Sequence, residues 1–419
     1  MENSSHVSHL SEKPVATADG HILHWYDTGA GMLAAKLAAI VGATRSVRLE
    51  QYIFQASAVG ERFRDALTAA ARRGVAVTVL LDDVGCLGLS RSYFRELEEA
   101  GGRIVWFNPM RWRLWTFRDH RKILIVDEKT AFLGGCNVAP EYDGDGVREG
   151  WRDGGVGISG PVVRVLVEAF ESQLEKAGNK IWLARRHGRN GWVEAGPDVS
   201  LLLMRPGLQQ GAFQAALRKD LLQARDVAMT MAYFLPRGRF KRALRRAARQ
   251  AHLFRLLVPG KSDIPMMSVA TRALYGPLQR SGVWIFEYQP QVLHAKIVVV
   301  DDIVYVGSSN LDPRSLSINF EVMLRVRSPE LAQRARETFQ HDLEHSLPAP
   351  RLSWRKPQNW WVRLKQKAAH FFFAWLDVGV AQLLVQKVER TSGRKSHKQG
   401  GHGAQEKNDC YAHSCPPAR

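Results

Sequence analysis

The sequence contains the same four blocks twice, in the same order. Each set has a short apolar run, a basic stretch with apolar residues at helical spacing, a second apolar run and a segment with a histidine and a lysine. The matched blocks are "RSVRLEQYIF" (45–54) and "RDVAMTMAYF" (225–234), "ERFRDALTAAARRG" (61–74) and "GRFKRALRRAARQA" (238–251), "VAVTVLLDD" (75–83) and "LFRLLVPGKSD" (253–263), "DHRKILIVDE" (119–128) and "LHAKIVVVDD" (293–302). Four matches in one order predict a duplicated β-α-β unit and an α/β fold with two related lobes.

Changes in composition predict where the lobes begin and end. The first 20 residues are polar, the join near 184–198 is basic and rich in glycine, and a breaker-rich link follows residue 348. We expect the following organisation: a disordered N-terminus (1–20), a first lobe (21–190), a second lobe (198–348), an amphipathic helical segment (355–390) and a disordered basic tail (391–419).

The fourth block carries candidate chemistry. Residues two apart on a strand share a face, so His120 and Lys122 point the same way, as do His294 and Lys296. The lysine can bind a phosphate oxygen, and the histidine can attack phosphorus or move a proton. One such motif could equally be a core histidine and a strand-edge lysine. Two copies at matching positions favour a paired phosphate site.

Further polar residues follow each motif. Asp127 and Asp301 come five residues after the lysines, where we expect them to hold the strand ends more than to touch substrate. Small residues and amides that could donate to phosphate come next: Gly135, Asn137, Ser308 and Asn310.

Two carboxylates could orient the histidines. Asp153 and Glu321 lie 33 and 27 residues after the histidine of their own copy. A carboxylate that accepts from one imidazole nitrogen fixes the tautomer and frees the other nitrogen for chemistry.

These motifs resemble those of the phospholipase D superfamily, whose hallmark is a duplicated HxKxxxxD motif with a trailing G-[GS]-x-N. The similarity covers roughly residues 20–348. Within the superfamily, "LEQYIF" (49–54), "GSSNLDPRSL" (307–316) and the aromatic C-terminal segment are most similar to bacterial cardiolipin synthases of the branch without N-terminal transmembrane helices.

The resemblance implies a fold and a reaction. The fold would be two pseudo-symmetric α-β-α lobes with mixed sheets and the active site at their interface. The reaction would be a metal-independent transfer that joins two phosphatidylglycerols into cardiolipin, releases glycerol and passes through a phosphohistidine. His120 would be the nucleophile and His294 the acid, although the symmetry of the motifs leaves the reverse open. Lys122, Lys296, Asn137, Ser308 and Asn310 would hold the charged oxygens.

The same residues leave other functions open. A hydrolytic phospholipase D that releases phosphatidic acid is the nearest alternative, followed by a nucleic-acid phosphodiesterase and an inactive membrane scaffold. The sequence has no carboxylate cluster suited to a metal, and we expect no cofactor.

The net charge of +18 indicates a polyanionic partner, which is either nucleic acid or an anionic membrane. Aromatic and basic residues alternate before His120, and a more apolar segment follows the second lobe. Both features are typical of a protein that contacts a lipid interface. The residues expected to contact the membrane are Trp112, Trp115, Phe117, Trp360, Trp361, Phe372 and Trp375. We expect anionic phospholipids (phosphatidylglycerol, cardiolipin) as partners, with phosphatidylethanolamine a possible donor, and no nucleic acid.

The start of the chain and its cysteines bear on location. The N-terminus has no signal-peptide pattern, no stretch is a convincing membrane span, and the four cysteines form neither a disulfide framework nor a zinc pattern. We expect a peripheral protein on the cytoplasmic face of the bacterial inner membrane.

Overall fold

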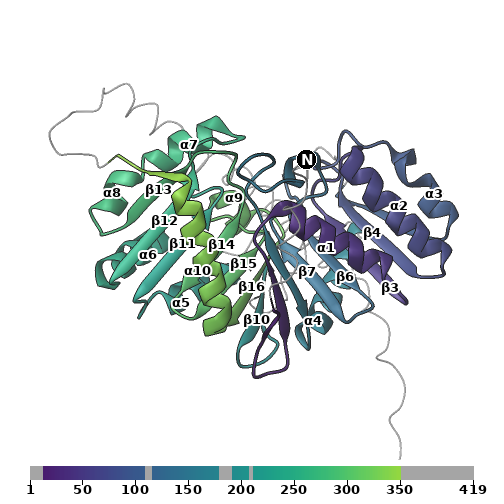
Figure 1. Cartoon of the computed structure of the whole chain (residues 1–419), viewed down its shortest axis with the longest axis horizontal. Coiled ribbons are helices and arrows are strands. Elements are labelled where there is room, and N and C mark those ends of the chain that lie inside the picture. The colour runs from purple at the N-terminus through teal and green to yellow at the C-terminus, as the bar shows by residue number, and fades with distance from the viewer. Residues whose placement is uncertain (1–12, 109–115, 179–190, 207–210, 351–419) are drawn as a thin grey trace, which may run out of the picture.

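The computed structural model describes residues 13–108, 116–178, 191–206 and 211–350. They form two lobes side by side, each built on a mixed β-sheet with helices on its faces (Figure 1). The α/β fold with two related lobes is therefore confirmed.

The first lobe has an eight-stranded sheet in the order β1-β2-β8-β7-β6-β3-β4-β5. Its elements are β1 (Val15–Ala16), β2 (Ile22–Tyr26), α1 (Gly29–Val41), β3 (Ser46–Gln51), α2 (Ala58–Arg72), β4 (Ala76–Asp82), η2 (Arg91–Phe94), α3 (Arg95–Glu99), β5 (Arg103–Phe107), β6 (Ile123–Val126), β7 (Thr130–Gly134), η3 (Pro140–Tyr142), β8 (Gly155–Ser159) and α4 (Val162–Gly178).

The second lobe has a nine-stranded sheet in the order β17-β13-β12-β11-β14-β15-β16-β10-β9. Its elements are β9 (Trp192–Glu194), β10 (Val199–Met204), α5 (Ala212–Asp220), β11 (Asp226–Met231), α6 (Gly238–Gln250), β12 (Leu253–Pro259), α7 (Pro265–Arg272), α8 (Tyr275–Gln279), β13 (Trp284–Tyr288), β14 (Lys296–Val300), β15 (Ile303–Gly307), α9 (Pro313–Ser317), β16 (Glu321–Arg327), α10 (Pro329–Glu344) and β17 (Ser346–Pro348).

Six central strands follow the same plan in both lobes. β3, β4 and β5 pair in parallel, and β3 pairs antiparallel with β6, which continues antiparallel into β7 and β8. β11 to β16 repeat these pairings. The residues just after β3 therefore lie beside those just before β6, and the residues just after β11 lie beside those just before β14.

Apolar residues at helical spacing explain how the outer helices pack. In α2, Phe63, Leu67 and Ala70 are buried, and in α6 the matching residues Phe240, Leu244 and Ala247 are buried. A third apolar core lies between the lobes. It combines strand residues of both sheets with one face of α4 and one face of α10, so the lobes form one body.

The structure corrects two predicted boundaries. Val15, inside the N-terminal segment expected to be disordered, is buried and pairs with Leu23 as part of β1. β9 joins the second sheet before the predicted start of that lobe at residue 198. The segments predicted for 355–390 and 391–419 lie outside the described residues. Among those described, no helix is both long and apolar enough to cross a bilayer.

Candidate active site

The two histidines lie where the lobes meet. Both histidines precede a strand, His120 before β6 and His294 before β14, and just ahead of each histidine the chain pairs with the other lobe: Asp119 forms a bridge with Phe320, and Leu293 with Arg152. The backbone N–H of His120 donates to the Phe320 carbonyl at 3.0 Å, and that of His294 donates to the Arg152 carbonyl at 2.8 Å. Each histidine backbone is therefore fixed by the lobe that did not supply it.

The carboxylates are exchanged between the lobes. His120 Nδ1 lies 3.0 Å from Glu321 Oε2, and His294 Nδ1 lies 2.6 Å from Asp153 Oδ2. Phe320 and Arg152, which make the bridges, directly precede these carboxylates and so deliver them across the interface. The sequence interpretation, which placed each carboxylate with the histidine of its own copy, is wrong on this pairing.

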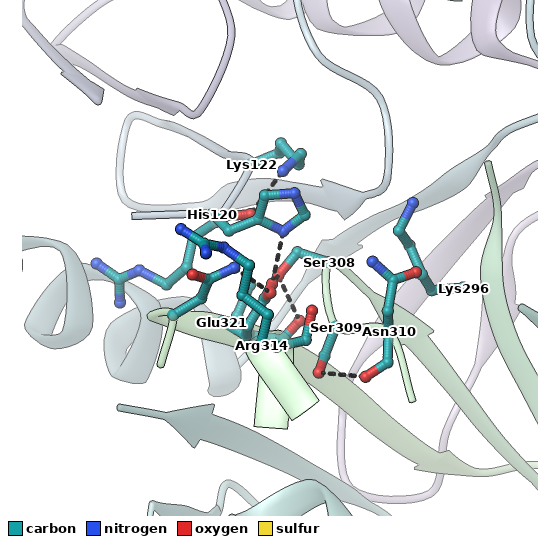
Figure 2. A network of polar contacts seen from close by, with 12 residues as sticks. His120, Lys122, Lys296, Ser308, Ser309, Asn310, Arg314 and Glu321 are labelled. Carbon is teal, nitrogen blue, oxygen red and sulfur yellow. Dashed lines mark hydrogen bonds and ion pairs between the residues drawn. The ribbon is translucent and has the colours of Figure 1, made fainter. Parts of the chain in front are cut away.

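The two lysines are buried beside their histidines. Lys122 Nζ donates to the His120 carbonyl at 2.6 Å and lies 5.0 Å from the centre of the Tyr52 ring. Lys296 Nζ donates to the His294 carbonyl and lies 2.8 Å from His294 Nδ1. Figure 2 shows Lys122 and Glu321 on either side of His120, with Ser308 beside the Glu321 carboxylate.

Burial lowers the pKa of all four basic groups, and repulsion between neighbouring cations adds to it for His120, His294 and Lys122. Burial lowers the pKa of His120 well below its usual value, and the charges of Lys122, Lys296 and His294 lower it further. For His294, burial and then Lys296 lower the pKa to about 4, although Asp153 acts in the opposite direction. Burial is also the main cause that brings the pKa of Lys122 to about 7 and that of Lys296 to about 8. An anion that enters the site would raise all four.

The two carboxylates differ in charge. Burial raises the pKa of Glu321 to about 7, against the lowering effect of Lys122. Burial raises the pKa of Asp153 too, but its hydrogen bond with His294 and the charge of Lys296 outweigh burial and leave it below the usual value. Asp153 is therefore ionised at neutral pH, whereas Glu321 takes up a proton much more readily.

Gly135 and Ser308 occupy matching positions next to these carboxylates. A Cβ atom on Gly135 would lie 2.3 Å from Asp153 Oδ2, so glycine leaves the room that this carboxylate fills. The Ser308 hydroxyl donates to Glu321 Oε2 at 2.6 Å. Both residues, predicted to bind phosphate, serve the carboxylates in this structure.

Asn137 and Asn310 also have matching contacts. Asn137 Oδ1 accepts from the Ile53 N–H at 3.2 Å, and Asn310 Oδ1 accepts from the Tyr233 N–H at 3.3 Å. These bonds hold the segments that follow β3 and β11. A contact with phosphate would therefore have to come from the amide nitrogens.

Asp127 and Asp301, counted with the catalytic motif, lie at the other end of the sheets. The Asp127 carboxylate accepts from the backbone N–H groups of residues 44–46, at the start of β3. Asp301 accepts from those of Arg225 and Asp226, at the start of β11. Tyr52, which follows β3 at its opposite end, is the residue that packs on His120, with ring centres 4.7 Å apart. The aspartates therefore fasten strand ends and are removed from the catalytic set.

The predicted membrane-contacting aromatic residues need one correction. Phe117 is fully buried, and its carbonyl accepts from Asn108 Nδ2 at 2.7 Å, so it does not face a membrane. The other six (Trp112, Trp115, Trp360, Trp361, Phe372 and Trp375) lie outside the described residues.

The sequence analysis missed Tyr142. Its hydroxyl lies 3.4 Å from His294 Nε2 and accepts from Asn137 Nδ2 at 2.8 Å. Trp151 completes this side, with its ring 5.4 Å from that of His294. One signal could have drawn attention to Tyr142: "NVAPEY" (137–142) and "NLDPRS" (310–315) share Asn and Pro at the same spacing, with Tyr142 aligned to Ser315.

Within the described ranges, no group of three or more His, Cys, Asp or Glu residues is placed to hold a metal ion. The cations whose charges act on His120 are those of Lys122, Lys296, His294 and Arg314.

Several known proteins with similar sequences are cardiolipin synthases. The family model described as "Cardiolipin synthase, PLD-like domain" matches residues 37–142 and 217–343. Cardiolipin synthase B of Escherichia coli and that of Salmonella typhimurium are each 32% identical over 364 residues, or 84% of this chain and 88% of theirs. The major cardiolipin synthase ClsA of Bacillus subtilis is 30% identical over 346 residues, or 80% of this chain and 71% of its own.

Solved structures with the same fold have diverged further in sequence. The phosphatidylserine synthase of Haemophilus influenzae matches with a TM-score of 0.64 at 15% identity, covering 90% of this chain and 94% of that one. A polyphosphate kinase from Porphyromonas gingivalis matches with a TM-score of 0.52 at 16% identity, covering 84% of this chain and 55% of that one. These likenesses support the two-lobed fold.

Proposed function

This chain belongs to the cardiolipin synthase family of phospholipase D-like proteins, and we propose that it is a phosphatidyltransferase that makes cardiolipin from two phosphatidylglycerols and releases glycerol. The observation that carries the proposal is the exchange of carboxylates. Each imidazole is held at Nδ1 by a carboxylate from the other lobe, so that the chemistry falls to the two Nε2 atoms, of which that of His294 lies beside Tyr142 and Lys296.

In the first step, His120 Nε2 attacks the phosphorus of phosphatidylglycerol. The bond from phosphorus to the glycerol oxygen breaks, and that oxygen takes a proton from His294. A phosphatidyl group is then bound to His120, and glycerol leaves.

In the second step, the hydroxyl of another phosphatidylglycerol attacks the same phosphorus. His294, now neutral, accepts the hydroxyl proton, and the bond from phosphorus to His120 breaks. Cardiolipin forms and both histidines return to their starting states. Water in place of the lipid alcohol would give phosphatidic acid, so synthesis depends on a positioned acceptor and limited water.

The choice of His120 as nucleophile rests on the two carboxylates. The ionised Asp153 stabilises an imidazolium on His294, which suits an acid. The pKa of Glu321 is about 7, so this carboxylate takes up a proton readily. Burial and the surrounding cations keep His120 uncharged, which suits a nucleophile. The phosphodiester brings the negative charge that raises the pKa of His294 enough to load it with a proton.

Lys122 and Lys296 supply the positive charge that stabilises the phosphoryl oxygens in the transition state. Because this charge comes from the chain, we propose that catalysis is independent of metal. Turnover should be unchanged by EDTA; loss of activity that a divalent ion restores would contradict the proposal.

The partners we propose are anionic phospholipids (phosphatidylglycerol and cardiolipin), with phosphatidylethanolamine as a second possible donor. The place of action we propose is the cytoplasmic face of the bacterial inner membrane, where the protein binds peripherally. The net charge of +18 supports attraction to that surface.

The deciding experiment incubates the purified full chain with phosphatidylglycerol and identifies the products by mass spectrometry. Cardiolipin and glycerol in equal amounts support a synthase. Phosphatidic acid without cardiolipin would instead identify a hydrolytic phospholipase D. His120→Ala, prepared in the same way, controls for lipid enzymes of the expression host.

A further inference from the structure

Among the described residues, some large apolar side chains are exposed at the ends of the sheets. Three follow the carboxyl ends of β4 and β12: Leu87 is 63% exposed, Ile264 37% and Met266 50%. We call Leu87, Ile264 and Met266 the apolar rim. Single exposed apolar residues are ordinary on soluble proteins, so the significance of the rim depends on its position.

The duplication relates the two sides of the rim. Leu87 lies five residues after Asp82, the last residue of β4, and Ile264 lies five residues after Pro259, the last residue of β12. Both lobes therefore present an exposed branched apolar side chain at the same place. In the second lobe, residues 263–266 are exposed in succession where the chain enters α7, at the upper edge in Figure 1.

Both sides of the rim lie at the edge that carries the histidines. In the first lobe, Gly85 packs so closely on Tyr52 that a Cβ would lie 1.9 Å from its carbonyl oxygen. Tyr52 in turn packs on His120. Leu87 lies two residues after Gly85, and only Tyr52 separates Gly85 from His120.

In the second lobe, other contacts connect the exposed residues to the site. The Tyr233 hydroxyl donates to Asp263 Oδ2 at 2.5 Å, and the Asp263 charge acts on Lys296 in the site. Ile264 follows directly. The Asp263 carboxylate is thus partnered by Tyr233, while the two apolar side chains at 264 and 266 remain exposed.

We propose that the apolar rim is a docking surface for an anionic lipid bilayer, with one contact on each lobe and the site between them. The proposal rests on the function proposed above, because a substrate with two acyl chains has to leave a bilayer to reach the histidines. Apolar tips that enter the interface bind through buried area, and the net charge of +18 attracts the protein to anionic headgroups.

The opposite edge offers a matched control. Val41, at the end of α1, and Leu222, just after α5, are each 61% exposed, which is within the range of the rim residues. They precede β3 and β11, beside the strand ends held by Asp127 and Asp301. A bilayer docked on the rim cannot reach them at the same time.

The first test compares two variants of the full chain. One is Leu87→Ser/Ile264→Ser/Met266→Ser and the other is Val41→Ser/Leu222→Ser, both checked by circular dichroism and thermal unfolding. The measurement is co-sedimentation with vesicles of phosphatidylglycerol and phosphatidylcholine. We expect the rim variant to bind more weakly by about tenfold or more, since each apolar side chain that enters the interface contributes on that scale, and the control variant to bind like wild type. Equal binding by all three proteins would refute the rim.

The second test locates the bilayer directly. An environment-sensitive fluorophore is attached in Leu87→Cys, Met266→Cys, Val41→Cys or Leu222→Cys, with Cys410 and Cys415 replaced by serine; Cys86 and Cys136 are buried. Adding vesicles should shift the emission to the blue at positions 87 and 266 only. No shift there while the protein is bound, or a shift that depends on protein concentration without vesicles, would overturn the proposal; the latter would mean that a second copy covers the rim. The two proposals fail separately, because the rim is judged from vesicle binding and the transferase from its products.

Discussion

The two lobes share one strand plan but surround their histidines differently. His120 lies against the Tyr52 ring, and its carboxylate partner Glu321 also accepts from Ser308. His294 lies against Trp151, and its partner Asp153 also accepts from the Gly154 N–H at 2.8 Å. The duplication therefore supplies two imidazoles in equivalent places, and substitutions around them give the two rings different neighbours.

The difference can be assigned to a few substitutions. A long carboxylate with a serine beside it serves His120, and a short one with a glycine beside it serves His294. The Tyr142 hydroxyl lies near Nε2 of His294, where the aligned residue of the other lobe is Ser315. Each of these can be changed separately, so the assignment of nucleophile and acid can be tested one contact at a time.

The largest effect should come from the histidines themselves. We expect His120→Ala and His294→Ala each to reduce turnover of phosphatidylglycerol by about 10⁴-fold or more. A phosphodiester with a p-nitrophenol leaving group should separate them, because that group departs without a proton. Release of p-nitrophenol should recover by about 10²-fold or more in His294→Ala and not in His120→Ala. Recovery in His120→Ala alone would reverse the assignment.

The carboxylates should differ in size of effect and in pH dependence. Asp153→Asn removes a firmly ionised partner from the acid, so we expect a loss of about 10²–10⁴-fold in kcat/KM that is constant between pH 5 and 9. Glu321→Gln should lower kcat/KM by about 10- to 100-fold above pH 7 and by less below it. The pKa of Glu321 is about 7, so below pH 7 the wild-type side chain is neutral, as glutamine is. Parallel pH profiles for the two variants would contradict the proposed difference in charge.

Much of the fold and of the site could be predicted from the sequence. The repeated blocks predicted the two lobes, since a duplicated β-α-β pattern leaves few alternatives for the sheets. The spacing of His120, Lys122 and their counterparts predicted which side chains meet. The strand expected to carry them begins later, since β6 starts at Ile123. Both inferences depend on local periodicity.

The exchange of carboxylates could not be predicted in this way. It depends on the bridges that Asp119 and Arg152 make with the other lobe, and sequence spacing holds no information about a contact between two lobes. Phe117 was misplaced for a related reason: its aromatic and basic neighbourhood suggested an interface, while its own side chain is buried. Ser308 was read as a phosphate donor because nothing local shows that Glu321 takes its proton.

Exchanging the small residues beside the two carboxylates, Gly135 and Ser308, should have a smaller effect on kcat. Gly135→Ser puts a Cβ where Asp153 Oδ2 lies, so we expect the carboxylate to shift and kcat to fall by about 10²-fold. Ser308→Gly removes one hydrogen bond to Glu321 and should cost roughly 5- to 10-fold. Gly88→Ser, at a position with open space around it, is the control and should leave kcat unchanged. A larger loss in Ser308→Gly than in Gly135→Ser would show that Ser308 meets the substrate directly.

Tyr142→Phe should have the smallest effect on turnover but a clear effect on the pKa of His294. Because Asn137 donates to the Tyr142 oxygen, the tyrosine proton is free to bond His294 Nε2, which stabilises the neutral ring. Removing the hydroxyl should therefore raise the pKa of His294 above about 4 in the free enzyme, with a change in kcat of only about threefold. The measurement is the pH titration of the His294 ring protons by NMR, with Tyr26→Phe, whose ring packs on Phe132 away from the site, as the control. An unchanged or lower pKa for His294 in Tyr142→Phe would mean that the hydroxyl accepts from an imidazolium instead, and that the acid is already protonated before the phosphodiester binds.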